Sequence, residues 1–313
     1  MTEGAKRGAA MNQGFTISVR YYRLSPALQP YFTALYAFDI ECAEGQFVED
    51  YLHPEWTAMR FTIGPVPHAR VGPGDLVPQW PFVASGPTSK ALHFRLTTGR
   101  IWGLGLQPAG WARFATGHAR ELTDRTVDGS AHASLTRFRP IEAIVRDKLQ
   151  DADAAAGAIN DHLMRHLGRP LRQEAVVFAC QEAIRDPDIP NVAALGERLG
   201  LNARALERLC SRYFGFPPKT LLRRQRFLRS LASFMLDGER VWSSALDRQY
   251  YDQAQFVKDF RSFMGMTPSE YAAMPHPIID RIMAQRMADQ GAAPETDLPT
   301  ILRYGGGAVT QTD

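Results

Sequence analysis

The chain has 313 residues, of which 45% are hydrophobic and 22% charged, and its formal net charge is only +3. These values predict two soluble globular domains, each with enough apolar residues for a core. Its three cysteines, Cys42, Cys180 and Cys210, are far apart and form no CxxC pair. This spacing argues against a disulfide framework or a zinc site and fits a reducing compartment. No apolar run approaches the roughly 20 residues of a membrane span, and the first residues lack the apolar core of a secretory signal. We therefore expect a cytoplasmic protein.

Residues 1–14 read as a loose tail, and residues 15–135 as a β-rich domain. Short runs such as FTISV, AMRFTI, ALHFRLTT and RIWGLGLQ have the apolar patterns of strands, and turn-forming stretches such as GPVP and GPGD separate them. Residues 108–116 have the pattern of a helix after the last of these strands. The expected architecture is a barrel or sandwich.

Helical spacing begins at about Arg139 and continues to Leu167, where a Gly and a Pro follow. We assign residues 136–187 to a helical linker or dimerisation segment. Its apolar stripe is expected either to form a homodimer interface or to pack on the β-rich domain. The DPDIP stretch marks the boundary to a helical domain at 188–275, and residues 276–313 are predicted to hold one more helix, 278–290, and a disordered tail.

The β-rich half offers few candidates for chemistry. Its histidines form no His-x-His pair of the kind that a cupin metal site needs, so we predict no metal and no cofactor. Its aromatic residues either line an apolar ligand pocket or fill the core: Trp56, Phe61, Trp80, Phe82, Phe94, Trp102 and Trp111. Cys42 is the candidate nucleophile for an enzyme, but no GxSxG, P-loop or HExxH motif occurs. We expect no enzyme.

The helical half contains an internal repeat with an offset of 50 residues. YFGFPPKTL in the first copy corresponds to FMGMTPSEY in the second, so that Gly215 matches Gly265 and Pro218 matches Pro268. The match extends upstream, where Asn202 corresponds to Asp252. A two-fold repeat predicts two copies of one structural unit.

The first copy has the pattern of a helix-turn-helix unit: a short helix from Val192 to Leu199, a Gly-containing turn, and a second helix that Asn202 caps. The second helix presents small residues and long hydrogen-bond donors on its outer face, as a major-groove recognition helix requires. In the second copy Asp252 is the cap, and Phe256 and Phe260 face inward. A single long helix, Pro218 to Leu236, is predicted to join the two units.

Basic residues concentrate between Arg198 and Arg229, where nine Lys and Arg accompany a single Glu. Such a cluster is typical of a surface that binds phosphate groups. A helical protein–protein interaction module beside a β-rich ligand-binding domain, without direct DNA binding, is the alternative.

The two copies resemble the DNA-binding domain of the AraC/XylS family, and the stretch YYDQAQFVKDFRSFMGMTPSEY is close to its signature. The resemblance covers roughly a quarter of the chain. It implies a seven-helix domain whose two recognition helices enter adjacent major-groove segments of double-stranded DNA. By position, it implies base-reading roles for Ala203, Arg204, Glu207 and Arg208 in the first unit, and for Gln253, Ala254, Gln255 and Lys258 in the second. From its place beyond Arg208, Arg212 is expected to reach toward the phosphates.

Two positions depart from the family pattern. Gln249 stands where the family often has Gly, which predicts a strained turn, and Cys210 stands where Phe is usual. The β-rich half is distantly similar to the cupin-like sensor domain of some members. The resemblance therefore implies a transcription regulator with a small-molecule effector, a homodimeric state and RNA polymerase as a further partner.

Overall fold

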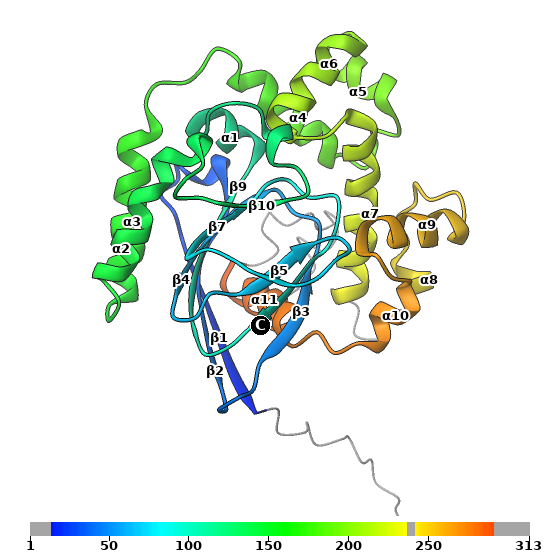
Figure 1. Cartoon of the computed structure of the whole chain (residues 1–313). Helices are drawn as coiled ribbons and strands as arrows, with labels where there is room; N and C mark the ends of the chain where they lie inside the picture. The colour runs from blue at the N-terminus through cyan, green and yellow to red at the C-terminus, as the bar shows by residue number, and fades with distance from the viewer. Residues whose placement is uncertain (1–13, 237–241, 291–313) are drawn as a thin grey trace, which may run out of the picture.

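The computed structural model describes residues 14–236 and 242–290. It has a β-rich N-terminal half followed by helices, among them two helix-turn-helix units, so the predicted α+β fold class is confirmed (Figure 1). The predicted N-terminal tail, apart from Gly14, and the predicted C-terminal tail after residue 290 lie outside the described residues. The domain bounds themselves stay a prediction.

Two antiparallel sheets make up the β-rich half, and their facing sides share one apolar cluster that includes Phe38, Ile40, Leu92, Phe94 and Leu96. This arrangement is a sandwich. The six-stranded sheet has the order β1 (Phe15–Tyr22), β2 (Phe32–Cys42), β9 (Gly99–Leu106), β4 (Thr57–Ile63), β7 (Phe82–Ser85) and β10 (Thr126–Asp128). The four-stranded sheet has the order β3 (Val48–Leu52), β8 (Leu92–Leu96), β5 (His68–Val71) and β6 (Val77–Pro78).

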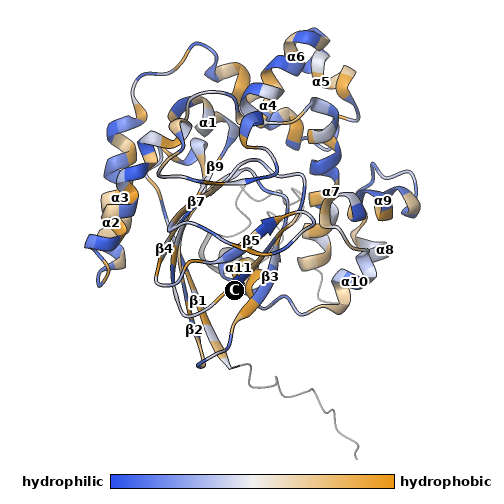
Figure 2. Cartoon of the chain, in the orientation of Figure 1, coloured by the Kyte–Doolittle hydropathy of each residue, from blue (hydrophilic) through white to orange (hydrophobic). Residues whose placement is uncertain are grey.

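The outer face of the six-stranded sheet is covered by helices. These are α1 (Pro108–Phe114), α2 (Arg139–Asp147) and α3 (Ala152–Leu167), and α4 (Glu174–Arg185) packs on α1. The short 3₁₀ turns η1 (Gln29–Tyr31), η2 (Ala119–Leu122) and η3 (Ala133–Phe138) lie between elements. Figure 2 shows apolar and polar residues side by side on α2 and α3, as on amphipathic helices.

The predicted helix pair after Arg139 is confirmed, and its apolar stripe is buried inside the chain. Ile141 and Val145 of α2, and Ile159 and Leu163 of α3, are at most 1% exposed and belong to the same core as the sheet. We expected this stripe either to form a homodimer interface or to pack on the β-rich domain, and in the structure it packs on the β-rich domain.

The described residues of the C-terminal half form helices joined by short connections. It contains α5 (Val192–Leu199), α6 (Ala203–Leu209), the π-helical turn η4 (Cys210–Phe214), α7 (Pro218–Leu236), α8 (Trp242–Ala245), α9 (Gln253–Met264), α10 (Pro268–Ala273) and α11 (Pro277–Gln290). Between residues 192 and 273 the described residues form six α-helices, and α4, which packs on α5 and α7, is a seventh.

The long helix α7 runs through two hydrophobic clusters. Near its start, Leu221 belongs to the large core that includes the sheet, α4 and the first helix-turn-helix unit. Further along, Phe227, Leu231 and Phe234 belong to a second cluster, which they share with α9, α10 and α11. The first helix-turn-helix unit is thus continuous with the main core, whereas the second packs in a separate cluster that also includes Ala91 of the β-rich half.

Candidate DNA interface

The two repeat copies adopt the same local structure. The side chain of Asn202 accepts a hydrogen bond from the backbone N–H of Ala205 at 2.9 Å, and that of Asp252 accepts one from Gln255 at 2.7 Å. Gly215 and Gly265 both have positive φ, at 85° and 76°, a backbone conformation that favours glycine. The predicted N-caps and the predicted repeat are confirmed.

The first recognition helix, α6, turns an apolar side inward and a polar side outward. Leu206 is fully buried against the core, whereas the predicted residues of this helix are exposed: Ala203, Arg204, Glu207 and Arg208. Arg212, on η4, is also exposed, with its guanidinium 5.3 Å from the ring centre of Tyr213. The predicted positions of this unit therefore share one accessible surface.

The second recognition helix, α9, has the same division. Gln253, Ala254 and Lys258 are exposed, and Phe256 and Phe260 are buried. Gln255 differs from the prediction, because it is half-buried and its side-chain oxygen accepts the N–H of Tyr251 at 3.1 Å. Its amide is therefore partly committed to holding the start of α9.

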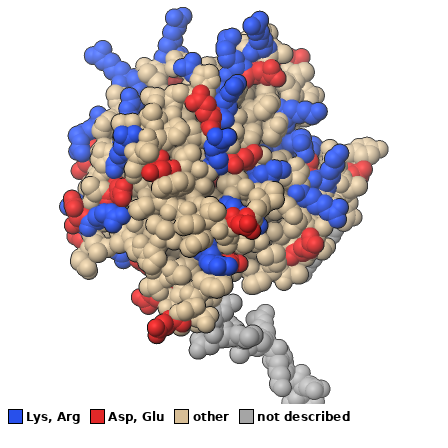
Figure 3. All heavy atoms as spheres, viewed as in Figure 1, with Lys and Arg blue, Asp and Glu red and all other residues tan. Residues whose placement is uncertain are grey.

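The basic cluster divides into two groups with different roles. Its exposed members lie on α5, α6, η4 and the start of α7: Arg198, Arg204, Arg208, Arg212 and Lys219. Figure 3 shows Lys and Arg gathered over the side of the molecule where α5, α6 and α9 lie. The other four members make contacts within the protein. Counting all nine as phosphate contacts therefore overstates the number of side chains that are available to phosphate groups.

Three of these four arginines connect α7 to the second unit. Arg223 and Arg226 bind the two oxygens of Asp259, on α9, at 2.6 and 2.9 Å, and Arg229 forms an ion pair with Asp247. Asp259 is 2% exposed. A buried carboxylate thus fixes recognition helix α9 against α7.

The fourth, Arg224, connects α7 to the β-rich half. It donates to the backbone oxygens of Glu55 and Thr88 at 3.2 and 3.0 Å, and its guanidinium lies 3.7 Å from the ring centre of Trp56. Nearby, the N–H of Ala91 donates to the carbonyl of Phe263 at 2.7 Å. The last turn of a helix leaves such carbonyls without an intrahelical partner, so the β-rich half caps the end of α9.

The two departures from the family pattern are accommodated. Among the described residues the only positive φ outside glycine is at Asp124, so the strained turn predicted at Gln249 does not occur. Gln249 instead donates to the backbone oxygen of Pro187 and accepts from Arg229. Cys210 is fully buried beside Cys180, and this contact raises the pKa of its thiol.

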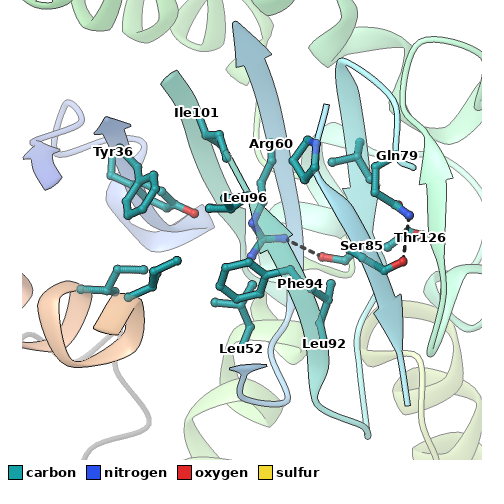
Figure 4. A pocket seen from close by; sticks show the side chains of 16 residues that line it. Tyr36, Leu52, Arg60, Gln79, Ser85, Leu92, Phe94, Leu96, Ile101 and Thr126 are labelled. Carbon is teal, nitrogen blue, oxygen red and sulfur yellow. Dashed lines mark hydrogen bonds between the residues drawn. The ribbon is translucent and has the colours of Figure 1, made fainter. Parts of the chain in front are cut away.

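A cavity of about 60 Å³ lies between the two sheets (Figure 4). Its lining is mostly apolar, with Arg60, Gln79, Ser85, Thr126 and the hydroxyl-bearing Tyr36 as polar exceptions. Of the seven aromatic residues predicted to line a pocket or fill the core, only Phe94 borders this cavity. Trp80 is 39% exposed, and the other five are buried in the main core.

The remaining candidates for chemistry are the metal-ligating side chains and the Cys42 thiol. Within residues 14–236 and 242–290, no group of three or more His, Cys, Asp and Glu side chains is placed to hold a metal ion. Burial raises the pKa of the Cys42 thiol, which disfavours the reactive thiolate. No helix in the described part of the chain is long and apolar enough to span a membrane.

A helix-turn-helix pair with capped, outward-facing recognition helices defines a class of DNA-binding protein. Residues 195–274, about a quarter of the chain, match the family model described as "Helix-turn-helix domain". A search of curated proteins gave no match. The findings support a DNA-binding transcription regulator.

Among solved structures, ToxT from Vibrio cholerae O395 shares 12% identity, with 83% of this chain and 97% of ToxT covered and a TM-score of 0.36. Wild-type ToxT from strain SCE256 bound to an unsaturated fatty acid shares 14% identity, with coverages of 84% and 96% and a TM-score of 0.35. The AraC-like transcriptional activator CuxR shares 12% identity, with coverages of 72% and 85% and a TM-score of 0.33.

Proposed function

We propose that the chain is a cytoplasmic, sequence-specific transcription regulator that reads two adjacent major-groove segments of double-stranded DNA with α6 and α9. The observation that carries the proposal is the pair of capped helices with polar outer faces, in two units that the single helix α7 joins. Arg204 and Arg208 are the proposed base-reading donors of the first helix. Gln253 and Lys258 take the same role in the second, with Ala203, Ala254 and Glu207 beside them.

Gln255 has a smaller part in this proposal than the other positions. Its side-chain oxygen is engaged with Tyr251, so only its N–H₂ group is available to a base. Arg212 and Lys219, which lie outside the recognition helices, are proposed phosphate contacts.

The test is selection of bound fragments from a random duplex library with the full chain, followed by a salt titration. We expect a motif with two boxes about one helical turn apart and an affinity that falls steeply with salt. Arg208→Ala should weaken binding by about 1–3 kcal/mol and relax the preference at one base position. A protein-binding module would give no enriched motif and would contradict the proposal.

Two further variants separate base contacts from charge. Lys219→Ala should weaken binding to all DNA sequences by the same factor, and it should reduce the slope of log affinity against log salt concentration by about one. Arg165→Ala, an exposed arginine on α3, removes the same charge far from both recognition helices and should leave DNA binding unchanged.

We further propose that the chain responds to a small-molecule effector through the cavity between the sheets. The cavity supports this because it is apolar with a few convergent polar groups, as ligand sites are. RNA polymerase and a second copy of the chain remain expected partners. A homodimer requires a surface other than the buried stripe of α2 and α3, and light scattering measures whether it forms.

A further inference from the structure

Helix α11 forms one wall of the cavity between the sheets. It follows the second helix-turn-helix unit in sequence but returns to the β-rich half, where Ile278 and Ile282 line the cavity. In Figure 4 it is the orange ribbon beside the cavity. The free volume of about 60 Å³ is far below the roughly 300–1,000 Å³ of ligand sites. The cavity is therefore largely filled by the chain itself.

The two sides of α11 belong to different clusters. Ile278 and Ile282, four residues apart and thus on one side of the helix, pack with the residues between the sheets. Ile279 and Met283 pack with α7, α9 and α10 of the second unit. A shift of α11 away from the cavity consequently disturbs the core of the second DNA-reading unit.

Asp50, on β3, holds the start of α11. One carboxylate oxygen accepts the backbone N–H groups of Ile278 and Ile279, each at 2.9 Å, and the other lies 3.3 Å from Nδ1 of His276. The first N–H groups of a helix have no partner within the helix, and a carboxylate is favoured at that end. Asp50 is 2% exposed, so this attachment is shielded from water.

Gln79 places an unpaired acceptor beside the cavity. Its Nε2 donates to the carbonyls of Ala69 and Val77 at 3.1 and 2.9 Å, which fixes the orientation of the amide. Its Oε1 is buried and has no hydrogen-bond partner among the described residues. Since buried polar atoms are almost always paired, this oxygen is suited to a donor on a ligand.

Arg60 does not provide an anion site in this cavity. Glu55 binds one of its terminal nitrogens through both carboxylate oxygens, at 2.8 and 3.0 Å, and the other nitrogen donates to Ser85 at 3.1 Å (Figure 4). Burial lowers the pKa of Arg60, but the Glu55 carboxylate and the Tyr36 hydroxyl together outweigh this effect and raise that pKa above its usual value. The positive charge is already neutralised, so a carboxylate or phosphate ligand gains nothing there.

We propose that the cavity binds an uncharged, mostly apolar ligand with one N–H or O–H donor for Gln79 Oε1, and that this ligand displaces Ile278 and Ile282 of α11. The ligand and these side chains of α11 therefore cannot occupy the cavity at the same time. Ligand entry breaks the Asp50 attachment and loosens the second DNA-reading unit. This inference rests on the proposed effector response and adds the class of ligand and the moving element.

Indole is a suitable probe because it is uncharged and apolar with one N–H donor. Its binding to the full chain, measured by titration calorimetry without DNA, should be weak in the wild type and at least tenfold tighter in Ile278→Ala/Ile282→Ala. Cavities of about 150 Å³ with apolar linings bind molecules of benzene size. Ile144→Ala, a partly buried isoleucine on α2, is the control and should bind as the wild type does.

Two comparisons test the class of ligand in the double variant. Benzofuran, which has the shape of indole without the donor, should bind at least fivefold more weakly, and Gln79→Leu should remove that difference while leaving benzofuran binding unchanged. Indole-3-carboxylate should bind more weakly than indole. Equal binding of indole and benzofuran, or tighter binding of the carboxylate, would overturn the assignment.

Hydrogen exchange tests the displacement of α11. Saturating indole should speed amide exchange in α11 and α10 of the wild type, and Asp50→Asn should both speed that exchange and tighten indole binding. Indole bound with α11 still protected, or no indole binding in any variant, refutes the inference. These readouts involve no DNA, so failure to select a DNA motif would count against the proposed function and leave this result standing.

Discussion

Asp259 is the residue whose removal most directly tests how recognition helix α9 is held. In Asp259→Asn the side chain keeps its size, but two arginines lose their shared counter-charge. Removing one partner of a buried ion pair typically costs about 3–5 kcal/mol. The side chain of Arg226 is only 14% exposed, whereas that of Arg223 is 36% exposed and can regain water. We therefore expect a loss at the lower end, about 3 kcal/mol.

This loss should appear locally, because α9 packs in a hydrophobic cluster separate from the one that holds α5 and α6. A change of about 3 kcal/mol corresponds to roughly a hundredfold faster amide exchange in α9, with α5 and α6 nearly unaffected. Asp188→Asn removes the same charge from the exposed pair with Arg248 and should change stability by less than about 1 kcal/mol. Equal protection of α9 in wild type and Asp259→Asn would refute the view that this carboxylate anchors the helix.

Three other changes have defined outcomes. Asn202→Ala removes the cap of α6 and should destabilise the first unit by about 1 kcal/mol, seen as faster exchange in that helix. Gly215→Ala should lower the free energy of urea unfolding by more than about 1 kcal/mol, because φ is +85° and the added Cβ would lie 2.7 Å from Cγ2 of Thr123. Its control is Gly157→Ala on α3, where the space around the glycine is open and the free energy of unfolding should rise by about 0.5–1 kcal/mol. Burial lowers the pKa of His53 to about 4, which is below the pKa of histidine in the unfolded chain. As the pH falls, the unfolded chain therefore protonates this imidazole before the folded protein does, and the stability of the fold decreases between about pH 6.5 and pH 4. In His53→Phe, the thermal unfolding temperature should no longer show the decrease that protonation of His53 causes in this pH range.

The local signals in the sequence predicted the two helix-turn-helix units well. The caps Asn202 and Asp252 lie within three residues of the groups they bind, and the 50-residue offset reports both units at once. The long strand β2 received no prediction of its own, since a continuous apolar run has no alternation to distinguish it. The shortest strands, such as β6 with two residues, have too few positions for a pattern.

The misjudged features depend on contacts between distant positions. Arg223 and Arg226 have the composition of a phosphate-binding surface, and only the fold shows that Asp259, more than 30 residues later, binds both. The role of α11 rests on Asp50 and Ile278, which are 228 positions apart. Charge and periodicity describe one segment at a time, so they reveal neither relation.

The course of α7 through two clusters has a consequence for how this chain can be recombined. A DNA-reading half cut out at residue 188 would take Leu195, Leu206 and Leu221 with it, and these side chains complete the core of the other half. Both fragments would then expose apolar surface at the cut. Exchange of such a half between related proteins would therefore require α4 and the loops around Trp56 to be exchanged with it, so the transferable module is larger than the two helix-turn-helix units.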